Sequence, residues 1–258
     1  TKLANIAASS MVSGSGVVKL AVPSSLTNAV SPLLLESTLF PLDDTDGQIK
    51  YNKEQIDELL TNIKVLAFGI GIGSSAEVDK MLSYILSSYS KTLLIDADGL
   101  NSLSKIGLDI LRTTKAKVIL TPHTKEMSRL SGYSVEEILQ SPINITKELA
   151  LKTNSIILLK GPTTIITDGS TVYLSSTGCA GMAKAGSGDV LSGVIAAICS
   201  YNEDNLLLAT AVSAFITGYA GEIAEIKSSS ISMLASDTVA NIKDAISILV
   251  NNGGKTST

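Results

Sequence analysis

The 258-residue chain has no tryptophan, two cysteines and a single histidine, and aromatic residues make up only 4% of it. Two cysteines, Cys179 and Cys199, are too few for a disulfide framework, and this usage fits a reducing compartment. Since 45% of the residues are hydrophobic, the core must consist mainly of Leu, Ile, Val and Ala. The length is enough for one large α/β domain or two small ones.

The chain also lacks runs of basic residues, and its net charge is −4. These features exclude the usual signature of a nucleic-acid partner. No uninterrupted apolar stretch reaches the roughly 18 residues of a membrane span, and the first residues lack the charged start of a signal peptide. We therefore expect a cytoplasmic globular protein with no membrane partner. Its high mean hydropathy of +0.33 suits a buried oligomer interface.

Short apolar runs bounded by Gly, Pro and Asp alternate with helical patterns along most of the chain. They predict buried strands at residues 16–23, 64–68, 91–98, 117–122 and 155–161. Strands of this kind, separated by helices, are typical of a mostly parallel sheet that is covered by helices.

The pattern changes in the last hundred residues. Two short runs joined at Asp168-Gly169 predict a β-hairpin. Only helical patterns follow, at 189–200, 205–226 and 232–250. Because the sequence shows no repeat, low-complexity tract or linker, we expect a single domain over residues 1–258.

Polar segments follow four of the predicted strands where those strands end. They are a glycine loop after Phe68, "DADGLN" after Ile95, "TPHTKEM" after Leu120 and "KGPTT" after Leu159. Ligands of open α/β sheets bind beyond the carboxyl ends of the strands, so the four segments predict one site at that edge.

The glycine loop fits the pattern G-x-G-x-x-A from Gly71 to Ala76, between a strand and a helix. This pattern is found in dinucleotide-binding folds, and Asp96 stands where a ribose-binding acid would be. A nicotinamide-dependent oxidoreductase is therefore one hypothesis. A tight turn whose backbone amides approach a phosphate is the other.

The segment "DADGLN" carries Asp96, Asp98 and Asn101. Two carboxylates at a strand end are suitable ligands for Mg²⁺, which makes Mg²⁺ a candidate cofactor. Asp98 is equally well placed to cap the following helix. The sequence favours neither role over the other.

His123 and Lys160 each follow a predicted strand. The histidine stands between a strand-end proline and a helix, and we expect it to contact a ligand. With no second His and no Cys nearby, a zinc site is not expected. Lys160 suits a phosphate as a point charge, although a solvated lysine at the edge of the hairpin is an alternative. The chain has no P-loop motif.

The strongest signal is "AGSGDVLSGVIAA", where Gly186 and Gly188 precede Asp189 at the start of an apolar helix. Glycines and a helix N-terminus direct amide N–H groups at an anion, and a nearby acid can act as a general base. The alternative is a plain helix start with an acid in its first turn. That alternative does not explain the glycines, which cost roughly 0.5–1 kcal/mol each when they have no use.

Together these segments resemble a known family. "GSGD" resembles the G-[ATS]-G-D signature of ribokinase-like small-molecule kinases. In order and spacing, "GIGIG", "DADGLN", "TPHTKEM", "LKGPTT", "TGCAGMAKAGSGDVLSGVIAA" and "ISMLASD" resemble the ADP/ATP-dependent NAD(P)H-hydrate dehydratases over essentially the whole chain. The resemblance implies a ribokinase-like three-layer α/β fold, in which helices flank a mostly parallel central sheet with a late hairpin.

The resemblance also implies a reaction, in which Asp189 takes a proton from the C6 hydroxyl of hydrated NADH or NADPH. ADP or ATP phosphorylates this hydroxyl, and phosphate is then eliminated; with ADP, which we expect here, the products are NAD(P)H, AMP and phosphate. Substrate contacts are expected at Gly71, Asn101, His123, Glu126 and Asp189. Nucleotide contacts are expected at Lys160, Gly161, Pro162, Thr163, Thr164, Gly186, Ser187 and Gly188.

The sequence departs from the family pattern in several loops. The usual T-P-H-P-G-E is T-P-H-T-K-E here, and Ala185 replaces the glycine before Gly186. Family members open with a strand and a Gly-Ser loop, and since this chain begins after them we expect a central strand to be missing. The resemblance further implies a homotetramer and a functional link to an NAD(P)H-hydrate epimerase on a separate chain.

Two other functions stay open at the level of sequence. The first is a ribokinase-like kinase of a small molecule such as a vitamin precursor, because "GSGD" is common to that superfamily. The second is a nucleotide-binding protein without catalytic activity.

Overall fold

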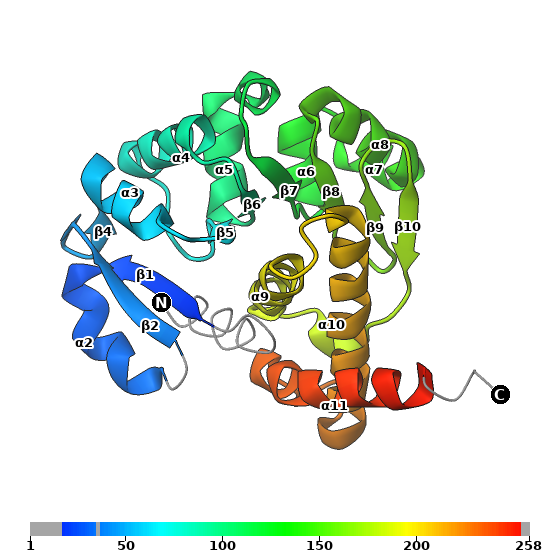
Figure 1. Ribbon diagram of the computed structural model, residues 1–258. Coiled ribbons are helices and arrows are strands. Elements are labelled where there is room, and N and C mark those ends of the chain that lie inside the picture. The colour runs from blue at the N-terminus through cyan, green and yellow to red at the C-terminus, as the bar shows by residue number, and fades with distance from the viewer. Residues whose placement is uncertain (1–16, 35–36, 254–258) are drawn as a thin grey trace.

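The computed structural model of the chain describes residues 17–34 and 37–253. They form a three-layer fold in which a six-stranded sheet lies between two layers of helices (Figure 1). The strand order is β10-β9-β8-β7-β6-β5, in which β5 to β8 are parallel and β9 and β10 are antiparallel. The strands are β5 (Val65–Phe68), β6 (Thr92–Ile95), β7 (Lys117–Leu120), β8 (Ile156–Leu159), β9 (Thr164–Thr167) and β10 (Val172–Ser175). The predicted α/β architecture and the late hairpin are confirmed.

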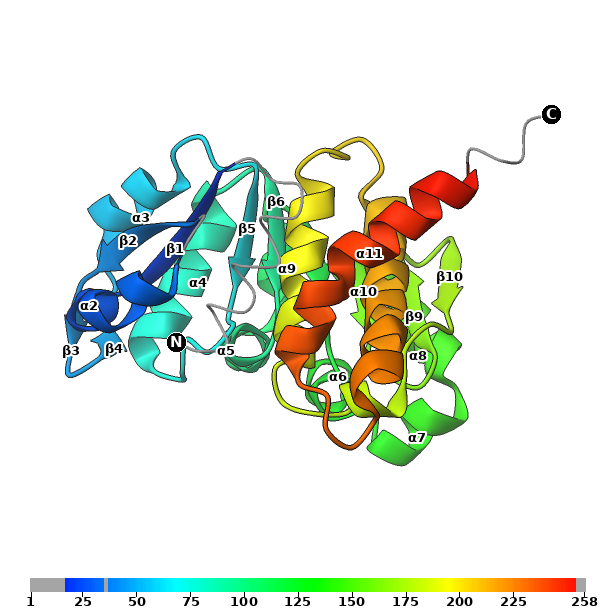
Figure 2. The same ribbon diagram turned by 90° about the horizontal axis from the view of Figure 1, so that it is seen from below.

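Helices cover both faces of this sheet (Figures 1 and 2). One face carries α3 (Lys53–Leu60), α4 (Ala76–Ser88), α5 (Asp98–Ile106), α6 (Thr124–Ser131), α7 (Val135–Gln140) and α8 (Pro142–Thr153). The other face carries α9 (Ser187–Cys199) and α10 (Leu206–Ser228), and α11 (Ala235–Gly253) packs on the outside of that pair. Short 3-10 helices lie at Ser24–Leu26, Ser31–Leu33, Leu108–Arg112 and Ala180–Met182.

Alternation along the strands explains why the central strands are apolar throughout. In β6, Leu93 and Ile95 belong to the core beneath α4 and α5, whereas Leu94 belongs to the core beneath α9 and α10. Successive strand residues point to opposite faces, so a strand covered on both sides must be apolar at every position.

A second, smaller sheet lies beside β5. It consists of β1 (Val18–Pro23) paired in parallel with β2 (Ser37–Leu42), with α2 (Thr27–Val30) between them in the chain. A two-residue hairpin of β3 (Asp44–Thr45) and β4 (Gln48–Ile49) follows. The strand predicted at 16–23 therefore forms, but it pairs outside the main sheet. Sequence patterning missed β2 because Pro41 interrupts its apolar run.

Of the helices in the described ranges, α10 is the one long and apolar enough to cross a membrane. Yet 56% of its apolar window is buried inside the fold, as in a core helix of a globular domain. Its burial against α9 and α11 accounts for its composition.

Candidate active site

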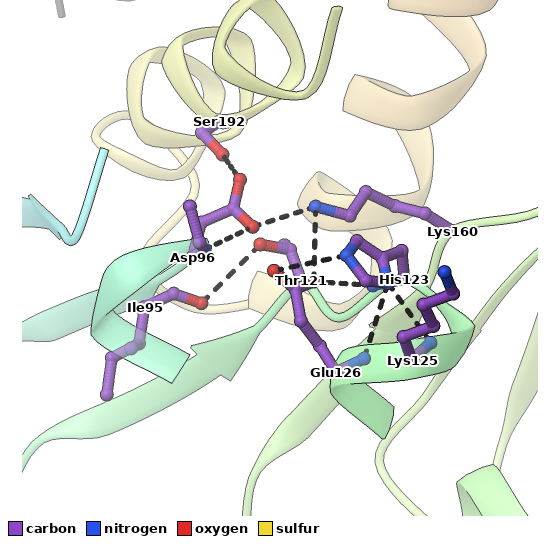
Figure 3. Close-up of polar contacts among 9 residues, drawn as sticks. Ile95, Asp96, Thr121, His123, Lys125, Glu126, Lys160 and Ser192 are labelled. Carbon is purple, nitrogen blue, oxygen red and sulfur yellow. Dashed lines mark hydrogen bonds and ion pairs between the residues drawn. The ribbon is translucent and has the colours of Figure 1, made fainter. Parts of the chain in front are cut away.

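The polar segments predicted to share one edge of the sheet meet below the N-terminus of α9 (Figure 3). Asp96 follows β6, His123 follows β7 and Lys160 follows β8. An isolated parallel bridge joins His123 to Lys160, and the Lys160 amide donates to the Pro122 carbonyl over 2.8 Å. Three of the four predicted segments, those after β6, β7 and β8, therefore meet at one edge of the sheet.

A buried ion pair forms the centre of the cluster. Lys160 Nζ lies 2.8 Å from Asp96 Oδ1 and 3.9 Å from Glu126 Oε2. The Asp96 side chain is 2% exposed and that of Lys160 is 22% exposed. Figure 3 shows the lysine reaching from its strand toward both carboxylates. The alternative of a solvated lysine at the hairpin edge is wrong.

Asp96 accepts from two further donors besides Lys160. Ser192 Oγ of α9 donates to its Oδ2 over 2.6 Å, and the backbone N–H of Ala97 donates to its Oδ1 over 2.8 Å. Ala97 adopts φ +49° and ψ −119°, a conformation that costs an alanine roughly 1–3 kcal/mol. A carboxylate neutralised by a lysine and bonded on both oxygens has little capacity left for a cation.

The hypothesis of Mg²⁺ between Asp96 and Asp98 does not fit this donor set. Asp98 Oδ2 accepts from the amide of Gly73 over 2.9 Å, so its carboxylate secures the glycine loop instead. Within the described ranges, no group of three or more His, Cys, Asp and Glu side chains converges as a metal site. Asp98 is also not the helix cap: it is the first residue of α5, and the cap position is occupied by Ala97.

The glycine loop after β5 is packed against the turn that carries Asp96. Gly69 has φ +106°, and a Cβ built on it would lie 2.1 Å from the Asp96 carbonyl oxygen and 2.3 Å from the Gly99 nitrogen. Gly71, predicted to contact the substrate, follows with φ +67°. The oxidoreductase hypothesis is not supported here, since Asp96, the acid that would bind the ribose, is paired with Lys160 and Ser192 instead.

His123 caps α6. Its Nδ1 accepts from the amides of Lys125 and Glu126 over 3.1 and 3.3 Å, and Glu126 Oε2 accepts from the His123 amide over 2.8 Å. In a neutral ring the proton therefore lies on Nε2, which is 3.6 Å from Glu126 Oε1. The imidazole is 49% exposed, so one edge of it stays open to a ligand.

The N-terminus of α9 presents amides toward this cluster. Gly186 is the cap residue with φ +97°, which lets the chain turn sharply into the helix. In the described part of the chain, the amides of Gly188 and Asp189 have no hydrogen-bond acceptor. A Cβ on Gly188 would lie 3.6 Å from Lys160 Nζ and 3.9 Å from Asp96 Oδ2, so this first turn sits directly on the ion pair.

Asp189 is the third residue of α9 and is 8% exposed. Its Oδ2 is fully buried and has no hydrogen-bond partner among the described residues, and the same holds for Ser187 Oγ two residues earlier. Burial, and secondarily the charge of Asp96, raises the pKa of Asp189 from 3.8 to about 6, while Lys160 opposes the shift. Unpartnered buried polar atoms are rare in native proteins, and here two occur in one helical turn. They mark a place where a ligand or water completes the structure.

The loop that leads into α9 is fastened to α10 by contacts that sequence reasoning missed. Glu222 accepts from the Gly178 amide over 2.9 Å, and Glu225 accepts from the Gly181 amide over 3.1 Å. The two acids are three residues apart and so lie on one face of the helix. That spacing was visible in the sequence, although the loop it serves was not.

The remaining predicted positions lie at the margin of the cluster. Gly161, Pro162 and Thr163 form an exposed turn between β8 and β9, and Thr164 begins β9. Asn101 is partly buried in the first turn of α5. The structure therefore brings Asp96, Lys160, Glu126, Gly188 and Asp189 together and leaves the 161–163 turn open beside them.

Comparison with known proteins supplies a family. The sequence profile of the NAD(P)H-hydrate dehydratase family matches residues 2–244. A bifunctional NAD(P)H-hydrate repair enzyme of Thermofilum pendens is 36% identical over 218 residues, 82% of this chain but 40% of that protein. The ADP-dependent (S)-NAD(P)H-hydrate dehydratase of Nitrosopumilus maritimus is 34% identical over 87% of this chain and 76% of its own length. The chain thus spans less than half of the bifunctional relative.

Solved structures support the fold. A hypothetical protein of Streptococcus mutans superposes with a TM-score of 0.82 and 24% identity, over 96% of this chain and 86% of that one. The Bacillus subtilis ADP/ATP-dependent NAD(P)H-hydrate dehydratase co-crystallised with ATP and Mg²⁺ superposes with a TM-score of 0.77 and 21% identity, over 96% and 84%.

Proposed function

This chain belongs to the NAD(P)H-hydrate dehydratase family, and we propose that it repairs hydrated NADH and NADPH at the expense of ADP. The phosphoryl group of ADP passes to the C6 hydroxyl of the hydrate, and elimination of phosphate restores the nicotinamide. The products are NAD(P)H, AMP and phosphate. The observation that carries this proposal is the buried Asp189 Oδ2 in the first turn of α9, which has no hydrogen-bond partner among the described residues and lies beside backbone amides that have no acceptor there.

Asp189 is the general base in this scheme. With a pKa of about 6 it is mostly deprotonated at neutral pH, yet basic enough to accept the proton of a hydroxyl as that hydroxyl attacks phosphorus. The amides of Gly188 and Asp189, with the positive end of the helix dipole, stabilise the charge on the transferring phosphoryl oxygens. Such preorganised donors need no rearrangement during the reaction.

The other predicted residues divide between the two ligands. The nucleotide lies along the exposed 161–163 turn, near Lys160 and Thr164, with its phosphates at Gly186, Ser187 and Gly188. The hydrate lies on the opposite side of Asp189, near Gly71, Asn101, His123 and Glu126. The Lys160 ammonium group lies beside Gly188, so it can contact a phosphate bound there while it stays paired with Asp96.

Mg²⁺ belongs to this proposal only as a companion of the nucleotide. The carboxylates of Asp96 and Asp98 are already engaged, so the ion would be held mainly by phosphate oxygens and water. Bound there, it would offset charge on the phosphates. The choice of ADP rests on the name of the Nitrosopumilus relative.

The assembly and setting are also proposed. Leu208, Val212 and Phe215 are exposed at helical spacing on α10, which provides an apolar stripe for contact between copies in a cytoplasmic homotetramer. An NAD(P)H-hydrate epimerase acting on the other form of the hydrate is the expected functional partner. The bifunctional names of several relatives support that link.

The alternative is a ribokinase-like kinase of a small alcohol, since base and anion site would serve either acceptor. A coupled assay separates the two. Prepared NADH hydrate with ADP should regain the absorbance of reduced nicotinamide and release one phosphate per molecule repaired. Failure to recover absorbance, together with phosphorylation of a vitamin alcohol by ATP, would establish the kinase instead. Failure with both acceptors would point to a nucleotide-binding protein without catalysis.

A further inference from the structure

The turn that leads into α9 carries a lysine, Lys184, two residues before the cap residue Gly186. The Ser187 amide donates to the Lys184 carbonyl over 3.4 Å, so residues 184–187 form a hydrogen-bonded turn. The first and last Cα atoms of such a turn lie less than about 7 Å apart. Because lysine has a flexible four-carbon stem, the side chain of Lys184 starts within reach of an anion bound at the first amides of α9.

The ammonium group of Lys184 has a neutral acceptor. It donates to the backbone carbonyl of Met233, in the segment between α10 and α11. Lys184 takes part in none of the ion pairs of the described residues. Lys160, whose ammonium group also lies near this turn, is paired with Asp96 over 2.8 Å and lies 3.9 Å from Glu126. The charge of Lys160 is therefore largely offset, whereas the charge of Lys184 is not.

The loop before this turn is bonded to α10 by contacts that do not involve Lys184. The amide of Gly178 donates to Glu222 over 2.9 Å, and the amide of Gly181 donates to Glu225 over 3.1 Å. These bonds hold the loop whichever acceptor the lysine has. The ammonium group can therefore change its partner while the backbone of the loop stays in place.

A nucleoside diphosphate in the proposed site brings several negative charges to this turn. The amides of Gly188 and Asp189 and the helix dipole supply only partial positive charges against them. When the Lys184 ammonium group exchanges the Met233 carbonyl for a phosphate oxygen, a partial negative charge is replaced by a full one. The Coulomb attraction increases with that charge, so the exchange is favourable.

We propose that Lys184 is a phosphate ligand of the nucleotide and makes the site selective for nucleotides with a charged phosphate chain. When the nucleotide binds, the ammonium group leaves the Met233 carbonyl and contacts the phosphate group that the α9 amides hold. This inference rests on the proposed function for the place of the nucleotide, but it depends on no step of the repair reaction.

Calorimetric titration with ADP and with inorganic pyrophosphate tests the charge of Lys184. Lys184→Met removes the charge and keeps a long side chain, so the Kd of both probes should rise about 10- to 100-fold. Lys184→Arg keeps the charge and should restore most of the affinity. Lys152→Met is the matched control, because it removes an exposed lysine from α8 on the opposite face of the sheet. Equal Kd values for Lys184→Met and Lys152→Met would overturn the proposal.

Ionic strength separates a phosphate contact from a purely structural role of Lys184. The loss of affinity in Lys184→Met should shrink as KCl rises from about 0.05 to 0.5 M, because salt screens the attraction between the ammonium group and the phosphates. A loss that stays constant with salt would show that Lys184 only bonds the turn to Met233. That result would overturn the proposal.

A crystal structure of the ADP complex tests the contact directly. Lys184 Nζ should lie within about 3 Å of a phosphate oxygen, and it should no longer bond to the Met233 carbonyl. An ammonium group that still donates to this carbonyl in the complex would overturn the proposal.

The same variants distinguish this proposal from the proposed function. If NADH hydrate is repaired and Lys184→Met binds ADP as wild type does, only the role of Lys184 is wrong. If ADP binding depends on Lys184 and no hydrate is repaired, only the proposed function is wrong. If wild type binds neither ADP nor pyrophosphate, the anion site that both proposals share is wrong.

Discussion

Asp96 and Asp189 are two buried carboxylates on either side of Gly188, and the fold treats them in opposite ways. Asp96 receives a lysine, a serine hydroxyl and a backbone amide. Asp189 has one oxygen, Oδ2, with no hydrogen-bond partner in the described part of the chain, and burial raises its pKa to about 6. The first is a fixed negative charge, and the second is an acid kept ready to exchange a proton. Burial alone therefore does not identify a general base. What distinguishes Asp189 from Asp96 is the lack of hydrogen-bond donors to its carboxylate.

The largest effect is expected from Asp189→Asn. Losing the base should lower turnover by about 10²- to 10⁴-fold, while nucleotide binding stays largely intact because the α9 amides remain. Steady-state rates and nucleotide titration by calorimetry measure the two separately. Asp204→Asn, an exposed acid just beyond α9, is the matched control and should leave turnover unchanged. Equal turnover for Asp189→Asn and wild type would contradict the assignment of the base.

Asp96→Asn should mainly affect stability. Removing one member of a buried pair leaves Lys160 uncompensated, at a cost of about 3–5 kcal/mol in the free energy of unfolding. It also removes a charge that raises the pKa of Asp189, so the acid limb of the rate profile should move to lower pH. Urea unfolding and the pH dependence of kcat/KM test both effects. An unchanged acid limb would show that the two carboxylates are not coupled.

Stability against pH distinguishes the two acids more finely. Between about pH 3.8 and 6 the folded chain holds the Asp189 proton more tightly than the unfolded chain does. The free energy of unfolding should therefore fall as pH rises through this window and then level off. Asp189→Asn removes that penalty and should be more stable than wild type above pH 7, by up to about 3 kcal/mol, with little gain near pH 4. Turnover needs the ionised form, so it should rise through the same window.

The smallest effect concerns His123, whose imidazole caps α6 while about half of its surface stays exposed to solvent. His123→Ala should cost about 1 kcal/mol through loss of the cap, whereas His123→Asn should restore that stability because Asn is a good cap. If the ring also contacts the hydrate, KM for the hydrate should rise in both variants. Thermal unfolding and KM measured side by side make the distinction, and an unchanged KM in His123→Asn would limit the histidine to its capping role.

Local sequence patterns predicted most of the strands and helices of this molecule, but few of the contacts between side chains that are distant in the sequence. The main-sheet strands and α9 to α11 follow from apolar runs and turn residues. The pairing of Asp96 with Lys160 could not be predicted, because 64 residues separate them and the same acid equally suited Mg²⁺. Asp98 shows the same limit: the sequence predicted either an Mg²⁺ ligand or a helix cap, and its carboxylate accepts from the Gly73 amide instead. For His123 the sequence predicted a ligand contact, and the cap that its ring provides to α6 was not foreseen. The glycines before Asp189 were informative because their intrinsic cost demanded a use.

Gly69 illustrates how a site can restrict sequence without touching a ligand. A methyl group there would overlap the carbonyl oxygen of Asp96, and the backbone conformation is unfavourable for any side chain. In a library of all single variants, this position should therefore tolerate no replacement, as if it were part of the chemistry. An evolutionary record of the protein would show the same immobility at Gly69 as at Asp189. At Gly69 the cause would be the packing of one turn against another, and at Asp189 it would be the transfer of a proton.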